Sequence, residues 1–120
     1  MEINYKDKTY FTGKDLALSV IGGRWKIVII WCLIQESPLR LSEMQKKLPE
    51  VNQRMLIRQL RELEDDNIIT RTVYPVVPPK VEYQLSEIGC LLEPVVTSIC
   101  DWGDIFSDSL ERDANKTEIE

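Results

Sequence analysis

Three arginines, at positions 54, 58 and 61, are the residues of this 120-residue sequence whose type and spacing point most directly to chemistry. Spacings of four and three residues bring Arg54, Arg58 and Arg61 to one face of a helix, which we predict from Asn52 to about Asp66. The opposite face repeats leucine, at Leu56, Leu60 and Leu63. A guanidinium presents a planar fork of N–H donors that suits phosphate oxygens and the edge of guanine. The pattern therefore predicts a helix that packs on one side and binds nucleic acid on the other.

The arginines also have a simpler interpretation, as a solvated helix face that keeps the protein in solution. Glu62 follows Arg58 by four residues, which is the spacing of an ion pair within a helix. Arg61 is the weakest of the three candidates.

Further polar side chains flank the arginine face. In chain order they are Ser42, Lys46, Asn52, Gln53, Arg71 and Lys80. We expect those on helices to contact base edges or phosphates, and Arg71 and Lys80 to contact the flanking backbone or the minor groove. Ser42 is equally explained as a helix cap in a capping box with Gln45, and the charges of Arg71 and Lys80 as ordinary surface charge.

Catalytic and metal-binding chemistry is not predicted. The sequence has no histidine, and Cys32, Cys90 and Cys100 stand singly in apolar stretches, which favours burial over a metal knuckle or a disulfide. The dense carboxylate cluster, formed by Glu62, Glu64, Asp65 and Asp66, lies at a helix end where burial is not expected. We expect no enzyme activity, no metal and no cofactor.

The net charge of −5 is distributed unevenly along the chain. Residues 1–80 carry 13 basic against 10 acidic side chains, whereas residues 81–120 carry 2 against 10. DNA responds to the local potential within about 10 Å at moderate salt. A basic reading face can therefore coexist with an acidic far side.

Periodicity and turn residues predict the elements that position these side chains. Helices are expected at 13–20, 24–35, 42–47 and 52–66, an extended segment at 39–41, strands at 68–74 and 81–85, and a last helix from residue 86 to about 106, with Pro94 as a place to bend. Prolines stiffen the tip of the hairpin. This order is typical of a winged helix-turn-helix, a mostly α fold with a small β wing at about 74–81, whose second helix can enter a major groove.

The last predicted helix is strongly apolar for a chain end, and a small domain cannot easily hide it. We expect residues 1–110 to form one domain and residues 111–120 a flexible charged tail. The expected dimer contacts are Leu16, Leu91, Val95, Ile99, Trp102 and Phe106. No apolar segment is long enough to span a membrane and no secretory signal is evident, so we expect a cytoplasmic protein.

Three ordered motifs resemble the HxlR-type regulators, which are winged-helix proteins related to MarR. They are residues 21–26 (IGGRWK), residues 55–64 with Met-Leu and Gln-Leu-Arg-Glu-Leu-Glu, and residues 71–85 with a proline-rich wing followed by Val-Glu-Tyr. The resemblance, over about residues 12–106, implies a homodimer built from the first and last helices. It also implies a roughly palindromic double-stranded DNA operator and control of a nearby gene.

Many members of that family carry a sensing cysteine about ten residues before the Gly-Gly pair, where this sequence has Thr12. Sensing of oxidants by that route is therefore not expected, and a small-molecule or redox effector stays unspecified. Two rival functions remain at this stage. One is a winged-helix protein-interaction module without DNA binding, and the other is a small enzyme built on the carboxylate cluster.

Overall fold

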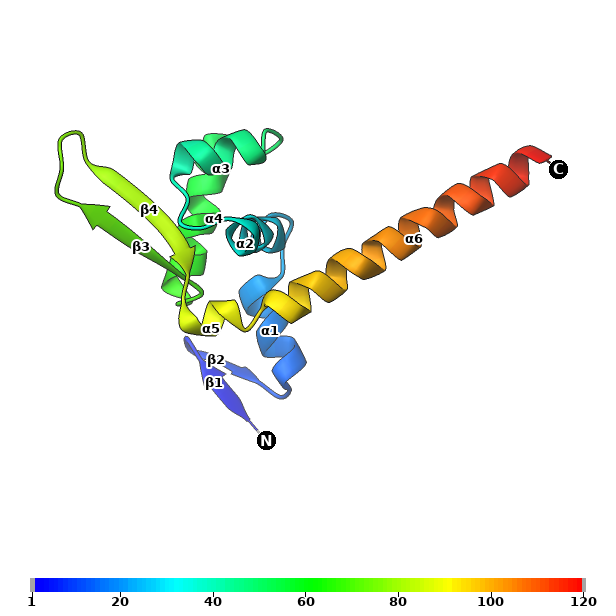
Figure 1. Cartoon of the computed structure of the whole chain (residues 1–120). Coiled ribbons are helices and arrows are strands. Elements are labelled where there is room, and N and C mark those ends of the chain that lie inside the picture. Colours follow the sequence, from blue (N-terminus) through cyan, green and yellow to red (C-terminus); the bar gives the residue numbers. More distant parts are fainter. Residues whose placement is uncertain (1, 120) are drawn as a thin grey trace.

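The computed structural model describes the backbone of residues 2–119 and the side chains of residues 2–115. The helices are α1 (Gly13–Ile21), α2 (Lys26–Gln35), α3 (Leu41–Lys47), α4 (Gln53–Asp65), α5 (Glu87–Cys90) and α6 (Glu93–Ile119). The strands are β1 (Ile3–Tyr5), β2 (Lys8–Tyr10), β3 (Ile69–Tyr74) and β4 (Lys80–Leu85), which form two separate antiparallel hairpins. The predicted winged helix-turn-helix, mostly helical with a small β wing, is confirmed (Figure 1).

Helix α2 lies at the centre of the body, as its apolar sequence predicts. Its residues Ile29, Ile30 and Leu33 are buried and belong to one core with Met44 of α3 and Leu60 of α4. Full burial of a side chain of this size contributes about 1.5–3 kcal/mol to folding. Within the described chain no single helix is long and apolar enough to cross a membrane, and α1 and α2 meet that criterion only when taken together, across an 80° bend.

Helix α3 is capped differently from the prediction. It begins at Leu41, and the side chain of Glu43 accepts a hydrogen bond from the backbone N–H of Arg40 at 2.8 Å. The predicted capping box of Ser42 and Gln45 is therefore wrong. The side-chain amide of Gln45 instead donates to the carbonyl oxygen of Val51 and so fixes the turn between α3 and α4. The hydroxyl of Ser42 is left exposed.

Helix α4 has the two ends and the two faces that the sequence predicts. The Asn52 side chain accepts a hydrogen bond from the Met55 N–H at 2.8 Å, and Asn67 ends the helical run in the left-handed conformation at φ 60°. The buried face carries Leu56, Leu60 and Leu63, and the exposed face carries Arg54, Arg58 and Arg61. Packing of the leucines therefore fixes the direction in which the arginines point.

The wing is the hairpin of β3 and β4, paired from Ile69 with Leu85 to Tyr74 with Lys80. Leu39 and Tyr83 exchange two backbone hydrogen bonds, of 2.9 and 2.8 Å, which confirms the predicted extended segment before α3 and joins it to the wing. The outer end of the wing projects from the body on the side away from α6 (Figure 1). The helix-turn-helix and the wing are thus held as one unit.

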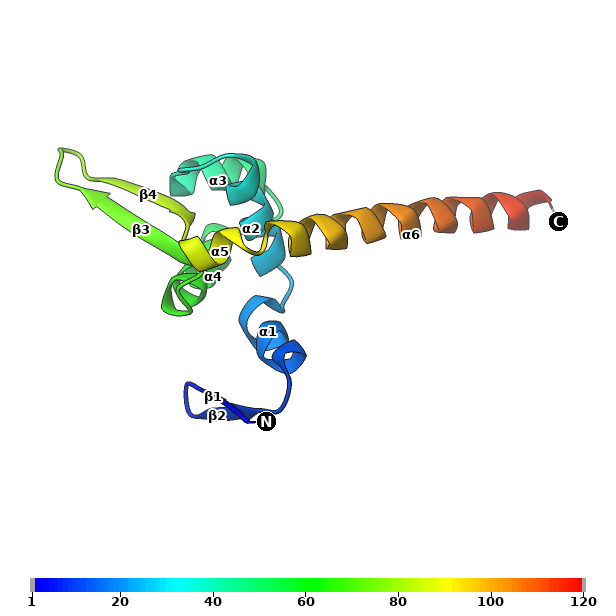
Figure 2. The same ribbon diagram turned by 60° about the horizontal axis from the view of Figure 1, so that its bottom comes forward.

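The N-terminal hairpin of β1 and β2 was not predicted. Its turn residues Lys6 and Asp7 both have positive φ, at 48° and 63°, as a two-residue turn of this kind requires. Such turns usually carry Asn or Gly, so a Lys-Asp pair gives little signal. Figure 2 shows the hairpin packed below the body beside α1.

The chain after the wing forms two helices rather than one helix bent at Pro94. Ser86 caps α5 as predicted, because its Oγ accepts a hydrogen bond from the Gly89 N–H at 3.0 Å. The break falls at residues 91–92, and Pro94 lies in the first turn of α6, where its missing N–H leaves no bond unmade.

Helix α6 is a rod of 27 residues that leaves the body (Figures 1 and 2). The radius of gyration is 17.7 Å, against about 14 Å for a compact chain of this length. The charged segment 111–119, predicted as a flexible tail, is helical here. Its Glu, Arg, Ala and Lys residues are good helix formers, so it continues the helix that begins at Glu93.

Candidate nucleic-acid interface

A hollow of about 970 Å³ lies between α3, α4 and the wing, and we call it the basic groove. It brings together six of the residues predicted to contact nucleic acid, which are Ser42, Lys46, Gln53, Arg61, Arg71 and Lys80. These residues are spread over 39 positions of the sequence. The bridge between Leu39 and Tyr83 ties the wing to the start of α3, so the groove has walls of fixed spacing.

The remaining predicted residues lie on the outer flank of α4. A second hollow, of about 490 Å³, is lined by Asn52, Arg54 and Arg58 together with Arg61, which also lines the basic groove. The N-terminal half of α4 thus forms a ridge between two depressions. A ridge of helical width is the shape that fits a major groove.

Most cations of this surface are not engaged within the chain. Among residues 2–115, the side chains of Arg54, Arg61 and Arg71 make no ion pair, and Lys46 makes none either. They are exposed, so water solvates them and their N–H donors can be redirected to a ligand at small cost. An arginine already paired with a carboxylate of the chain would not be available to a ligand in this way.

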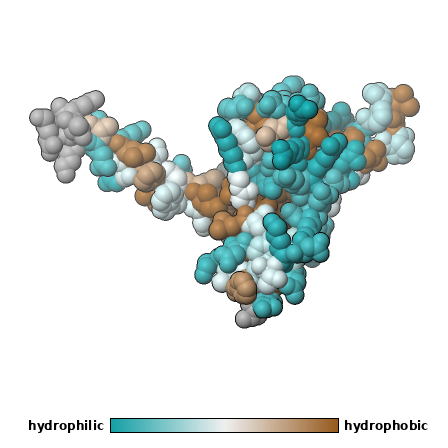
Figure 3. Space-filling view, turned by 180° about the vertical axis from the view of Figure 1, so that it is seen from behind, coloured by the Kyte–Doolittle hydropathy of each residue, from teal (hydrophilic) through white to brown (hydrophobic). Residues whose placement is uncertain are grey.

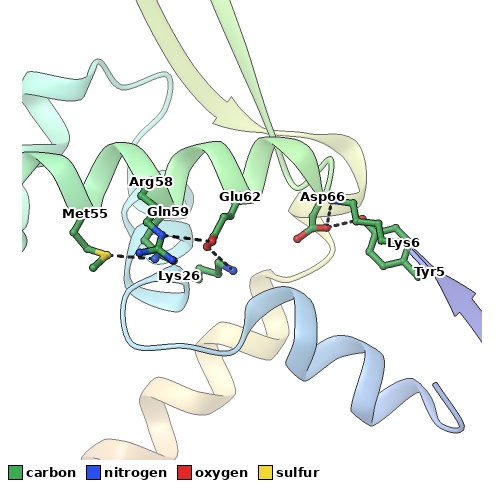
Figure 4. A network of polar contacts seen from close by, with 8 residues as sticks. All are labelled: Tyr5, Lys6, Lys26, Met55, Arg58, Gln59, Glu62 and Asp66. Carbon is green, nitrogen blue, oxygen red and sulfur yellow. Dashed lines mark hydrogen bonds and ion pairs between the residues drawn. The ribbon is translucent and has the colours of Figure 1, made fainter. Parts of the chain in front are cut away.

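Arg58 has one weak contact. Its Nε lies 3.9 Å from Oε1 of Glu62, while Oε2 of the same carboxylate lies 3.1 Å from Nζ of Lys26 in α2 (Figure 4). An exposed ion pair at i,i+4 contributes about 0.3–0.5 kcal/mol. The predicted pairing of Arg58 with Glu62 exists, but the nearer partner of Glu62 is a lysine 36 positions away.

The C-terminal end of α4 is tied to the N-terminal hairpin. The Tyr5 hydroxyl donates to Oδ1 of Asp66 at 2.6 Å, and Lys6 Nζ lies 2.9 Å from the same oxygen (Figure 4). Burial raises the pKa of Asp66, but the contacts from Tyr5 and Lys6 outweigh it and leave the pKa below its usual 3.8. The hydrogen bond to Asp66 raises the pKa of Tyr5. The carboxylate cluster at this helix end is therefore partly used to anchor the hairpin.

Lys80 is less free than predicted. Its Nζ lies 2.8 Å from Oε1 of Glu82 and 5.1 Å from the centre of the Tyr74 ring. Beyond it the wing tip is apolar, with Val76 half exposed and Val77 fully exposed. Within residues 2–115, the wing thus offers nucleic acid the unpaired Arg71, the paired Lys80 and an apolar tip.

The sequence analysis missed several residues that line the two hollows, among them Arg40, Ile57 and the acidic Glu64. Arg40 lines the basic groove from the residue before α3, and Ile57 lines both hollows on α4. Arg40 was overlooked because it was assigned to an extended segment that would pair with strands. Ile57 could have been found from its spacing, because it follows Gln53 by four residues and so lies one turn along the same face.

Metal-ligating side chains do not cluster among the described residues, and the three cysteines differ in their exposure. Residues 2–115 contain no group of three or more possible metal ligands. Cys32 is buried, which raises the pKa of its thiol, and Cys100 is half buried. The predicted burial of Cys90 is wrong, because α5 is a short surface helix in which Gly89 alone is buried.

Helix α6 presents a different kind of surface. Apolar side chains on one side of α6 stay exposed at helical spacing and, with Leu91 just before the helix, form what we call the apolar stripe, made of Leu91, Val95, Ile99, Trp102, Ile105, Phe106 and Leu110. Trp102 stacks on Phe106 with ring centres 5.1 Å apart, and both residues remain exposed. Figure 3 shows apolar side chains along α6 and where it meets the body. The stripe contains five of the six predicted dimer residues.

The sixth, Leu16, is half buried, and Leu18 of α1 is the more exposed at 68%. Phe11 and Ile88 are also exposed. Together with Ile105 and Leu110, these are the exposed large apolar residues outside the wing that the sequence analysis did not select.

Two helices joined by a tight turn, with a β wing beside them and a basic groove between, define a winged-helix DNA-binding protein. Comparison with known proteins agrees with this class. The family described as HxlR-like helix-turn-helix matches residues 20–111, and the chain belongs to this family.

Relatives and solved structures support the assignment. An HTH-type transcriptional regulator of Methanothermobacter thermautotrophicus is 40% identical over 110 residues, which are 92% of this chain and 83% of the relative. The HTH-type transcriptional regulator YtcD of Bacillus subtilis is 48% identical over 96 residues, 80% of this chain and 75% of the relative. The redox regulator HypR in its reduced form superposes with a TM-score of 0.78 at 44% identity, over 84% of this chain and 99% of that chain. The predicted HxlR-type membership is confirmed, and these relatives are regulators of transcription rather than enzymes.

Proposed function

We propose that this chain is a homodimeric transcriptional regulator that binds a pseudo-palindromic DNA operator sequence-specifically. The observation that carries the proposal is the basic groove, where side chains of α3, α4 and the wing converge and most cations have no partner in the chain. DNA is the polyanion whose major groove admits a helix of this size. Most acidic side chains of residues 81–120 lie on α5 and α6, whereas Glu82 lies on β4 and pairs with Lys80 of the groove.

The proposed contacts divide by element. Side chains of α4 and its cap read the major groove, those of α3 and the wing hold the backbone on either side, and the wing tip reaches the flanking minor groove. The first set is Asn52, Gln53, Arg54, Arg58 and Arg61, and the second is Ser42, Lys46, Arg71 and Lys80. Ser42 is available for a phosphate because its hydroxyl is exposed and does not cap α3.

The dimer is proposed from the apolar stripe. Six large apolar side chains on α6, with Leu91 just before it, expose a surface of a kind that monomeric proteins rarely keep. A second copy of the same helix is complementary to it by symmetry, with Leu16 and Leu18 of α1 at its margin. A two-fold axis there sets two copies of α4 about 34 Å apart, one turn of DNA. We place such a regulator in the cytoplasm.

The family's thiol sensor is not part of this proposal. Thr12 stands at that position and caps α1, because its Oγ1 accepts a hydrogen bond from the Asp15 N–H at 3.2 Å. HypR is described as a redox regulator. In this chain an effector would have to act elsewhere.

The test is titration of DNA with Arg54→Ala and Arg58→Ala variants, after fragments bound by the wild type have been selected from genomic DNA. Loss of one base contact should weaken specific binding by about 1–3 kcal/mol and relax the base preference at one position of each half-site. Fluorescence polarisation at two salt concentrations measures both affinity and its salt dependence.

The matched control is Arg112→Ala, which removes the same charge near the far end of α6. It should leave affinity within about twofold, since exposed charges beyond about 10 Å are screened. Wild-type affinity in both α4 variants, or binding that does not weaken with salt, would contradict the proposal and favour a protein-interaction module.

A further inference from the structure

We propose that Lys26 of α2 is a positioning residue for DNA binding, because it holds the carboxylate of Glu62 and so leaves Arg58 free. The inference rests on the proposed binding of DNA by α4. It assigns to the Lys of the IGGRWK motif a role in recognition, although that side chain does not line either hollow beside α4.

Two cations compete for one carboxylate on the exposed flank of α4. The Lys26 ammonium lies 3.1 Å from Oε2 of Glu62, whereas the Arg58 guanidinium lies 3.9 Å from Oε1, near the limit of an ion pair. Figure 4 shows Glu62 reaching down from α4 toward Lys26, with Arg58 one turn earlier on the helix. The shorter of these two distances shows that the Glu62 carboxylate pairs mainly with Lys26.

The burial of Lys26 explains why Glu62 pairs with it rather than with Arg58. Its side chain is 12% exposed, against 71% for Arg58 and 42% for Glu62. A largely buried ammonium without a counter-ion is costly, whereas an exposed guanidinium is well solvated. Glu62 is the one carboxylate within ion-pair distance of Lys26 among residues 2–115. The pair is therefore needed by Lys26 but not by Arg58.

The consequence for DNA follows from charge. With Lys26 present, the Lys26–Glu62 pair is neutral and Arg58 keeps its full charge for a phosphate or a guanine. Without Lys26, the Glu62 carboxylate stands unopposed one turn from Arg58. It would then bind the guanidinium and repel phosphate on the same face of the helix.

Another acidic side chain at this end of α4, Asp66, supplies a control. Lys6 pairs with Asp66 at 2.9 Å, so it also neutralises a carboxylate of this region from outside the helix. Asp66, however, follows Arg58 by two helical turns and lies beyond the last residue of α4. Removal of Lys6 lowers the net charge by the same amount as removal of Lys26, but it leaves no unpaired carboxylate beside Arg58.

The experiment measures affinity for the operator duplex selected by the wild type, using Lys26→Met, Glu62→Gln, the double variant and Lys6→Met. Lys26→Met should bind about five- to tenfold more weakly, and the double variant should return to within about twofold of the wild type. Lys26→Arg, which can still pair with Glu62, should also bind normally, and Lys6→Met should stay within about twofold. Circular dichroism confirms that each variant is folded.

Wild-type affinity in Lys26→Met, or a double variant as weak as Lys26→Met, would overturn the inference. The second result would mean that Lys26 acts through the fold or through DNA itself. Should Lys26→Met not fold, Glu62→Gln alone decides. It should tighten binding by less than about threefold if Lys26 already holds the carboxylate, and tenfold tightening would overturn the inference. A wild type that binds no duplex would overturn the proposed function itself.

Discussion

The basic groove and the apolar stripe are both exposed in a single chain, but exposure has a different cost in each. The groove is lined by charged and amide groups, which water solvates, together with apolar residues such as Leu41, Ile57 and Val81. The stripe exposes seven large apolar side chains, and apolar surface left in water costs about 25 cal/mol per Å². A partner that covers α6 would therefore stabilise the chain itself, whereas the proposed DNA partner on α4 would serve its function rather than its stability.

Because of this contrast, binding of the two proposed partners should depend differently on salt concentration. Association through the stripe is hydrophobic and should change little with salt. Binding at the groove should weaken steeply with salt, because each neutralised phosphate releases counter-ions. We therefore expect the chain to be dimeric before it binds DNA.

Charged substitutions in the stripe should have the largest effect. Ile99→Asp with Trp102→Asp should weaken dimerisation by at least about 4 kcal/mol, near a thousandfold in Kd, because carboxylates would be buried unpaired between the helices. Light scattering should then give a mass near 14.0 kDa. Asp101→Asn, beside Trp102, is the control and should stay dimeric. A stripe variant that remains dimeric would break the comparison.

A substitution on the buried face of α4 should have the next largest effect. Leu60→Ala leaves a cavity in the core and should lower the free energy of unfolding by about 2–5 kcal/mol, measured by urea denaturation. Arg58→Ala, two positions earlier on the exposed face, should change it by less than about 0.5 kcal/mol. Equal losses in the two variants would show that the arginine face also serves packing.

Removal of the wing lysine should have a smaller effect. Lys80→Ala should weaken binding to all duplexes alike by roughly 0.5–1 kcal/mol and lower the slope of log affinity against log salt by about one. The loss is limited because Glu82 already neutralises part of this charge. Lys14→Ala on α1 should leave the slope unchanged. A loss confined to one operator sequence would instead assign Lys80 to base reading.

The smallest effect should come from the hairpin anchor. Because the pKa of Asp66 is lower in the fold than its usual 3.8, its contacts stabilise the fold above that pH and are lost as pH falls through the lowered value. The melting temperature of Asp66→Asn should lie slightly below that of the wild type near neutral pH. The gap, worth about 1 kcal/mol or less, should close on acidification. A gap that stays the same on acidification would contradict this role of the Asp66 carboxylate.

Much of the interface could be predicted because it depends on local periodicity. The two faces of α4 follow from leucine and arginine spacing within one helix, and its ends follow from Asn52 and Asn67. The N-terminal hairpin could not be predicted in this way, because its turn residues, Lys6 and Asp7, have no strong turn preference. The cap of α3 was misassigned by two residues, since Ser42 and Glu43 both suit a first turn.

The sequence by itself determined which helix is two-faced, where the wing turns and which family the motifs resemble, since each depends on residues a few positions apart. Only the tertiary structure decided which charges are free. The assignment of Glu62 to Lys26 and of Asp66 to Lys6 joins residues 36 and 60 positions apart. The physical reason is that an ion pair depends on distance in space, which the packing of α2 and the hairpin against α4 sets and which no local spacing encodes.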